Sequence, residues 1–167
     1  ADTIKEQFVA NAKAIAEQTA LATAKKTANE TAKTVAQQTA METAKNTAMV
    51  SAKTANPNLT QEELQAIGLK AANQAKLTTE QLNAIGKQAE NLSDAKIKQI
   101  KAEADAEIEA QRTTIEKQGI ASAKAIAEQT ALTSAQSATT LAAKKTATSV
   151  ATTVGNKVKS EASKKVA

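Results

Sequence analysis

Histidine and cysteine are absent from the 167-residue chain, and Phe8 is its only aromatic residue. The chain therefore lacks the usual ligands of zinc, copper, haem and iron–sulfur clusters. It also lacks the imidazole base that Ser-His-Asp and Cys-His nucleophile systems need near neutral pH. Its four glycines are far apart in the sequence, so no glycine-rich phosphate loop is present. We therefore expect no cofactor, no bound metal and no enzymatic activity.

Large apolar side chains are also scarce, whereas 40 residues are alanine and 23 are threonine. A buried leucine contributes about 1.5–3 kcal/mol and an alanine methyl much less, so one chain cannot easily build a thick core. Such a chain is either disordered or forms alanine-faced helices that pack very closely, above all against copies of itself. Because alanine is the best helix former, we expect an ordered all-α fold.

Long apolar runs are missing as well, and no stretch has the length and hydrophobicity of a transmembrane helix. The lack of cysteine shows only that no disulfide is used. The sequence begins with Ala1-Asp2, which suits cleavage after the small residues of a signal-peptide site. On this basis we expect a secreted or cell-surface protein.

The only proline, Pro57, gives the clearest break in the helical pattern. Three similar segments follow it, each with a Thr or Ser that can accept hydrogen bonds from the first backbone N–H groups of a helix. In the first two, a Glu or Gln three residues later completes a capping box. The predicted cap residues are Thr60, Glu63, Thr78, Gln81 and Ser93.

These signals divide the chain into a long N-terminal helix (1–56), a tip of short helices (57–92), a long C-terminal helix (93–155) and a basic polar tail (156–167). Within the long C-terminal helix, Gly119 is expected to bend or interrupt the helix and Gly155 to end it. We expect the two long helices, joined by two short capped ones, to form a helical hairpin or a bundle-forming rod.

One ten-residue segment, AKAIAEQTAL, occurs at 12–21 and again at 123–132. If the short helices turn the chain around near residue 75, the two copies would face each other across an antiparallel hairpin. The same duplication could equally pair between neighbouring chains.

The dominant pattern is an alanine at every fourth position, which threonine precedes in most tetrads. A step of four residues advances about 40° beyond a full helical turn, so the stripe winds around the helix in a right-handed sense. One straight partner cannot cover such a stripe, which therefore favours a multi-helix assembly with close approach. The predicted interface residues are Ala20, Ala24, Ala28, Ala32, Ala36, Ala40, Ala44, Ala48, Ala52, Ala123, Ala127, Ala131, Ala135, Ala143, Ala147 and Ala151.

The pattern leaves several functions open. We expect a structural, self-assembling homo-oligomer, such as the subunit of an extracellular filament, tube or sheath. An ice-binding helix is an alternative, although the four-residue Thr spacing spirals and does not form a flat rank. A desiccation-type or lipid-surface helix is another, although it would need more large apolar residues on one face. The stripe could also be a helix-favouring low-complexity tract without a partner.

Charge is concentrated near the C-terminus, where residues 119–167 carry +5. Such a cluster can hold an anionic surface, although it can equally be a solubilising tail. Nucleic acid is disfavoured because no aromatic residues stack bases and Arg112 is the only arginine. The lysines of the cluster are Lys144, Lys145, Lys157, Lys159, Lys164 and Lys165.

Overall fold

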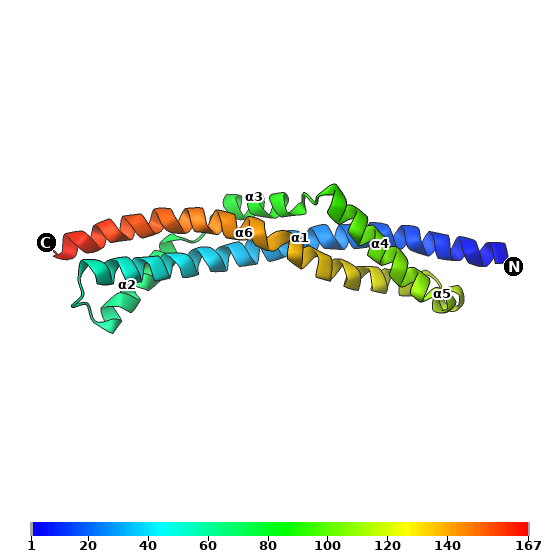
Figure 1. The fold of residues 1–167 in the computed structure, drawn as a ribbon, viewed down its shortest axis with the longest axis horizontal. Helices are drawn as coiled ribbons and strands as arrows, with labels where there is room; N and C mark the ends of the chain where they lie inside the picture. The colour runs from blue at the N-terminus through cyan, green and yellow to red at the C-terminus, as the bar shows by residue number, and fades with distance from the viewer. Residues whose placement is uncertain (1, 167) are drawn as a thin grey trace. The chain divides into compact units, whose positions relative to one another are not determined.

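The computed structural model describes the backbone of residues 2–166, which is helical apart from short connections and contains no strand. Side chains are described for residues 3–136, 139, 140 and 142–156. This confirms the all-α fold with two long helices. In chain order the helices are α1 (Asp2–Ala55), α2 (Gln61–Gln74), α3 (Thr79–Glu90), α4 (Asp94–Ala110), α5 (Arg112–Gln118) and α6 (Ile120–Val166) (Figure 1).

The chain forms two compact units, and each is built from three separate stretches of helix. Unit 1 contains Ala1–Thr31 and Lys87–Thr139, and unit 2 contains Ala32–Gly86 and Thr140–Ala167. The long helices α1 and α6 contribute to both units. Each unit therefore combines part of the expected N-terminal helix with parts of the middle and C-terminal segments.

Unit 1 is a three-helix bundle of α1, the α4–α5 segment and α6. The Lys13 ammonium on α1 lies 2.8 Å from the Glu109 carboxylate on α4. The Ser134 hydroxyl on α6 donates to the Glu103 carboxylate on α4 at 3.2 Å. These contacts tie both long helices to the same middle segment.

Unit 2 repeats this plan with α1, the α2–α3 segment and α6. Its main core cluster contains alanines from all three stretches, namely Ala44, Ala48, Ala71, Ala75 and Ala151. The side-chain oxygen of Gln37 on α1 accepts a hydrogen bond from the Leu77 backbone N–H at 3.0 Å. This bond fixes the connection between α2 and α3 against α1.

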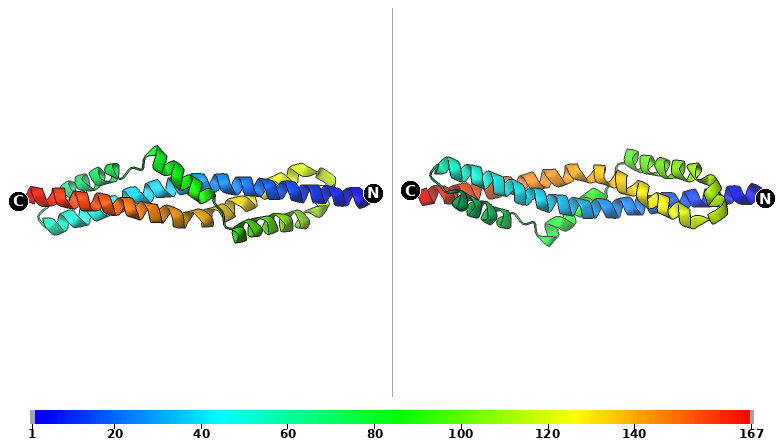
Figure 2. Two further views of the ribbon diagram at one scale, coloured as in Figure 1. Left: turned by 90° about the horizontal axis from the view of Figure 1, so that it is seen from above. Right: turned by 90° about the horizontal axis from the view of Figure 1, so that it is seen from below.

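Within each unit the stretches of α1 and α6 run in the same direction, so the expected antiparallel hairpin is wrong and the bundle alternative holds. In unit 1, α1 and α6 both begin at one end while α4 runs towards that end (Figures 1 and 2). In unit 2, both long helices finish at one end, where α2 begins. The physical reason is that the middle stretch of each unit runs opposite to α1, and the chain reverses a second time before α6.

The duplicated segments consequently lie in parallel register within unit 1. Phe8 lies against the backbone of Gly119, which is 111 positions later in the sequence. The second copy of the ten-residue segment, at 123–132, also begins 111 positions after the first, at 12–21. The repeat therefore supplies two equivalent helix faces that pack in one chain.

The expected long helix at 93–155 is divided into three helices: the interruption at Gly119 agrees with the sequence prediction, whereas the break at Gln111 was not predicted. Gln111 separates α4 from α5, and Gly119 separates α5 from α6. Gly119 has a φ of 81°, a conformation that L side chains rarely adopt, and its N–H bonds to the Ile115 carbonyl at 2.7 Å. Gly155 lies inside α6 and does not end it, because the helix continues through Val166.

The first three helices after Pro57, α2, α3 and α4, begin with side-chain caps. The Thr60 hydroxyl accepts from the Glu63 N–H at 3.1 Å, while Glu63 accepts from the Thr60 N–H at 3.2 Å. Thr78 and Gln81 form the same reciprocal pair at α3. Ser93 accepts from the backbone N–H of the third residue of α4. These bonds satisfy backbone donors that the helices cannot satisfy themselves.

Candidate functional site

The stripe of every fourth alanine is the feature with the clearest structural role. All sixteen alanines predicted as interface residues have 0% of their surface exposed within a single chain. Their packing therefore takes place between helices of the same chain. An interface between chains through these residues remains a prediction, and it would require the helices of one chain to separate first.

The four residues of each tetrad of α1 differ in burial, and the order of burial is nearly the same in every tetrad. Around Ala32, the preceding Thr31 and the following Lys33 are half-buried, whereas Thr34 is exposed. The same order recurs along α1, with small variations near Lys25 and Thr47. Because both flanks of the stripe are covered, α1 has a neighbouring helix on each side in both units.

The stripe of α6 is covered on one flank only. Ile126 and Thr130, which precede stripe alanines, are half-buried. Lys124 and Glu128, which follow stripe alanines, are exposed. The outer face of α6 is therefore open to solvent along both units, whereas α1 between Ala12 and Ala52 exposes only about one residue in each tetrad.

Large side chains in unit 1 come from the middle segment and fill the space that alanine leaves. Ile100 and Ile108 on α4 and Ile115 on α5 are among the largest fully buried side chains of the described residues. The long helices contribute mainly buried alanines to the same unit, so bulky and small side chains are combined in unit 1.

Several core positions of the long helices were not predicted as site residues. Ala12 and Ala16 continue the α1 stripe towards the N-terminus, and both are fully buried. Thr139 occupies the α6 stripe position between Ala135 and Ala143, and its hydroxyl donates to the Gln136 carbonyl at 3.2 Å. Ala12, Ala16 and Thr139 all follow the four-residue spacing of the stripe, so this spacing is the sequence signal that identifies them. Val9, which is 2% exposed, begins the core three residues before the stripe.

Gly155 is at a close approach of α6 to α1 in unit 2. It takes the stripe position after Ala151, and a Cβ atom added to it would lie 2.6 Å from the Cγ2 methyl of Thr47. No side chain larger than hydrogen fits there without a shift. The small-residue pattern therefore extends to glycine at this position.

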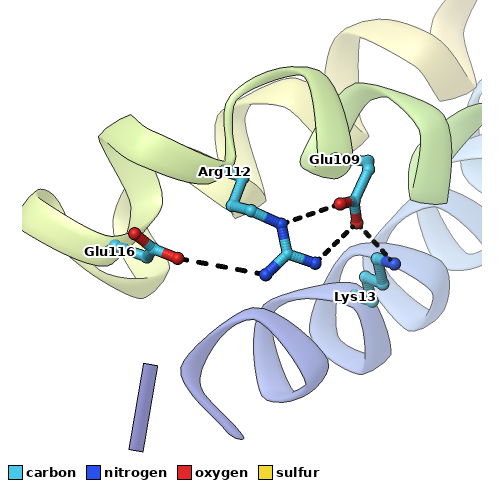
Figure 3. A network of polar contacts seen from close by, with 4 residues as sticks. All are labelled: Lys13, Glu109, Arg112 and Glu116. Carbon is cyan, nitrogen blue, oxygen red and sulfur yellow. Dashed lines mark hydrogen bonds and ion pairs between the residues drawn. The ribbon is translucent and has the colours of Figure 1, made fainter. Parts of the chain in front are cut away.

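A polar cluster joins α1, α4 and α5 at the surface of unit 1 (Figure 3). Arg112 donates to both carboxylate oxygens of Glu109, at 2.7 and 3.1 Å, and Lys13 lies 2.8 Å from the same carboxylate. The more distant Glu116 lies 3.9 Å from Arg112. The hydrogen bonds from Arg112 and then from Lys13 lower the pKa of Glu109 to about 2.

This cluster holds α1 to the turn between α4 and α5, and its geometry suits positioning rather than catalysis. Every charged group is paired with an opposite charge, and the arrangement offers no nucleophile with an adjacent base. Exposed ion pairs of this kind contribute little to stability. The cluster therefore helps to set the register of the helices.

Two surface hollows are lined mainly by residues of polar type. One, of about 350 Å³, lies between α4 and α6 and is lined by Glu107, Gln111, Ile126, Gln129, Thr130 and Thr133. The other, of about 620 Å³, is lined by Lys144, Lys145, Thr148 and Ser149. Over the described residues, no group of three or more acidic side chains could hold a metal ion. No helix in the described part is both long and apolar enough to cross a membrane.

Comparisons with protein families, with curated proteins and with solved structures found no match to this chain.

Enlarging one stripe alanine should destabilise the single chain. Ala24 is fully buried on α1, whereas Ala22 on the same helix is exposed. We expect Ala24→Leu to lower stability by about 1–3 kcal/mol through overpacking. Ala22→Leu is the matched control and should change stability by less than about 0.5 kcal/mol. Thermal and urea unfolding followed by circular dichroism would measure both. Equal stability of the two variants would show that the stripe is not packed within the chain.

Proposed function

We propose that the protein is a non-enzymatic structural subunit that assembles with its own copies into a filament, tube or sheath. The observation that carries the proposal is the use of nearly every tetrad of two long helices to build alanine-cored bundles. Such cores allow helices to pack at close range and favour a stiff building block.

Contacts between copies need a surface other than the stripe, because the stripe is already buried. Unit 1 has an apolar cluster of Ile4, Phe8 and Ile120, which are 66%, 39% and 42% exposed. Ile4 and Phe8 are one turn apart on α1, and Phe8 lies against Gly119, the neighbour of Ile120. Grouped exposed apolar side chains are typical of protein interaction sites.

The two alternatives from the sequence receive less support. An ice-binding rank needs exposed threonines in a flat row, but the stripe threonines Thr19, Thr23, Thr27, Thr31, Thr39 and Thr43 are half-buried beside their alanines. A helix that folds only on lipid would need an unsatisfied apolar face, whereas the apolar stripe of this chain is covered in both units.

The self-assembly proposal is tested by removing the apolar cluster without touching the core. We expect the Ile4→Ser, Ile120→Ser double variant to remain monomeric at concentrations where the unmodified chain forms large oligomers or filaments. The control is Val50→Ser, Leu69→Ser, which removes two exposed side chains of unit 2. Size-exclusion chromatography with light scattering and negative-stain microscopy would compare all three.

A strictly monomeric unmodified chain at high concentration would overturn the assembly proposal. Assembly that both double variants retain would instead reject the Ile4, Phe8 and Ile120 cluster as the contact surface.

A second candidate function, binding to an anionic surface, is favoured by the distribution of charge. Unit 2 contains 11 lysines and 5 acidic residues, whereas unit 1 contains 11 basic and 12 acidic residues. Lys144 and Lys145 are both exposed on the open outer face of α6 and line its hollow. The side chains of residues 157–167, with four further lysines, lie outside the described residues.

This candidate predicts salt-sensitive binding to vesicles that contain anionic lipid and none to neutral vesicles. Lys144→Gln, Lys145→Gln should weaken cosedimentation several-fold, because each lysine near an anionic membrane contributes about 1 kcal/mol. Lys25→Gln, Lys26→Gln is the matched control, since it removes an exposed lysine pair from unit 1. Equal loss in both variants would indicate a response to net charge and not a binding face.

A further inference from the structure

The packing of α1 against α4 follows a simple antiparallel register. Lys13 on α1 pairs with Glu109 on α4. Glu17 lies one helical turn after Lys13 on α1, and Asp105 lies one helical turn before Glu109 on α4. Because the two helices are antiparallel, this register places Glu17 opposite Asp105. Both new residues directly follow a fully buried alanine, Ala16 and Ala104, and both are half-buried. One helical turn from an attractive ion pair, two carboxyl groups therefore face each other across α1 and α4.

The Asp105 side chain has an oxygen atom without a hydrogen-bond donor in this contact. Its Oδ1 atom is buried and has no hydrogen-bond partner. A buried carboxylate oxygen without a donor is costly, because it has lost water and gained no hydrogen bond. The Glu17 carboxyl group on the facing helix can supply the missing donor only when it carries a proton.

The charged neighbours do not neutralise the pair. On α1, Lys13 is shared with Glu109, and on α4, Lys101 is exposed. On α6, the nearest charged side chains along the repeat, Lys124 and Glu128, are exposed. Burial raises the pKa of Glu17, as do its hydrogen bond to Asp105 and repulsion from it, while Lys101 and Lys13 act in the opposite direction.

We propose that Glu17 and Asp105 form a proton-sensitive contact between α1 and α4. The contact is tight while one proton is held between the two carboxyl groups, with Glu17 donating to the Asp105 carboxylate. When that proton leaves, two negative charges face each other and α4 loosens from α1. The contact does not depend on the proposed assembly, because both helices belong to unit 1.

The direction of the pH effect follows from the folded and unfolded protonation states. The pKa of Glu17 is raised above its ordinary value of 4.5. Its contribution to stability is therefore fully present below 4.5 and is lost as the pH rises through the raised pKa. Glu109 acts oppositely, since its contribution is present above 4.5 and is lost as the pH falls towards its pKa of about 2.

The experiment compares Glu17→Gln with Glu128→Gln by thermal unfolding of the full chain between pH 4 and pH 8. Glu128 occupies the same position in the second copy of the repeat but is exposed, which makes it a matched control. A glutamine at 17 donates to Asp105 at every pH. We expect Glu17→Gln to raise the melting temperature at pH 8 by about 2–4 °C, and this gain should disappear near pH 4.

A carbon-13 titration of the unmodified chain provides a second readout that does not depend on a variant. We expect the Glu17 carboxyl carbon to titrate above 4.5. Either of two results would overturn the proposal. One is a Glu17→Gln profile that parallels the Glu128→Gln profile, and the other is a Glu17 titration at or below 4.5.

Discussion

The structure depends on the small volume of the alanine side chain at one position in every four. On α1 this position is fully buried from Ala12 to Ala52, so the fully buried residue of each turn is a single alanine. Such a helix can be approached closely, and Gly155 of α6 lies near Thr47 in this way. Individual burial energies are small, and stability must come from many repeated contacts. This explains why nearly the whole chain is committed to helix.

The close packing of two alanine-faced helices also determines which side chains the third helical stretch of each unit must bury in the core. In unit 1 the third stretch brings isoleucines, with Ile100, Ile108 and Ile115 fully buried. In unit 2 it brings alanines together with Leu64, and Gly68 faces Lys45 and Met49 of α1. The core is thus filled by complementary sizes and not by uniformly large residues. The polar cluster around Glu109 and the facing acids Glu17 and Asp105 lie at the edges of this core, where α1 meets α4.

Local signals in the sequence predicted local structure well. Capping residues such as Thr60 and Ser93 specify where helices begin, and the alanine phase specifies which face of each long helix is buried. The direction of α6 relative to α1 was not predictable in the same way, because the repeat at 12–21 and 123–132 fits either direction. The direction of α6 is determined by the breaks at Gln111 and Gly119, because they reverse the chain once more before α6. The pairing of Glu17 with Asp105 depends on the antiparallel register of α4 against α1, which no local pattern in the sequence specifies.

The most direct test of this account is a disulfide between cysteines placed at Thr47 and Gly155. A Cβ atom at Gly155 would lie 3.3 Å from the Thr47 Cβ, close to the separation that a disulfide spans. The chain has no cysteine of its own, so the engineered pair is the only one that can form. The account predicts rapid oxidation to a cross-linked monomer, independent of protein concentration. Cross-linked dimers that form only at high concentration, or no cross-link in a variant that circular dichroism shows to be folded, would contradict parallel packing of α1 and α6 within one chain.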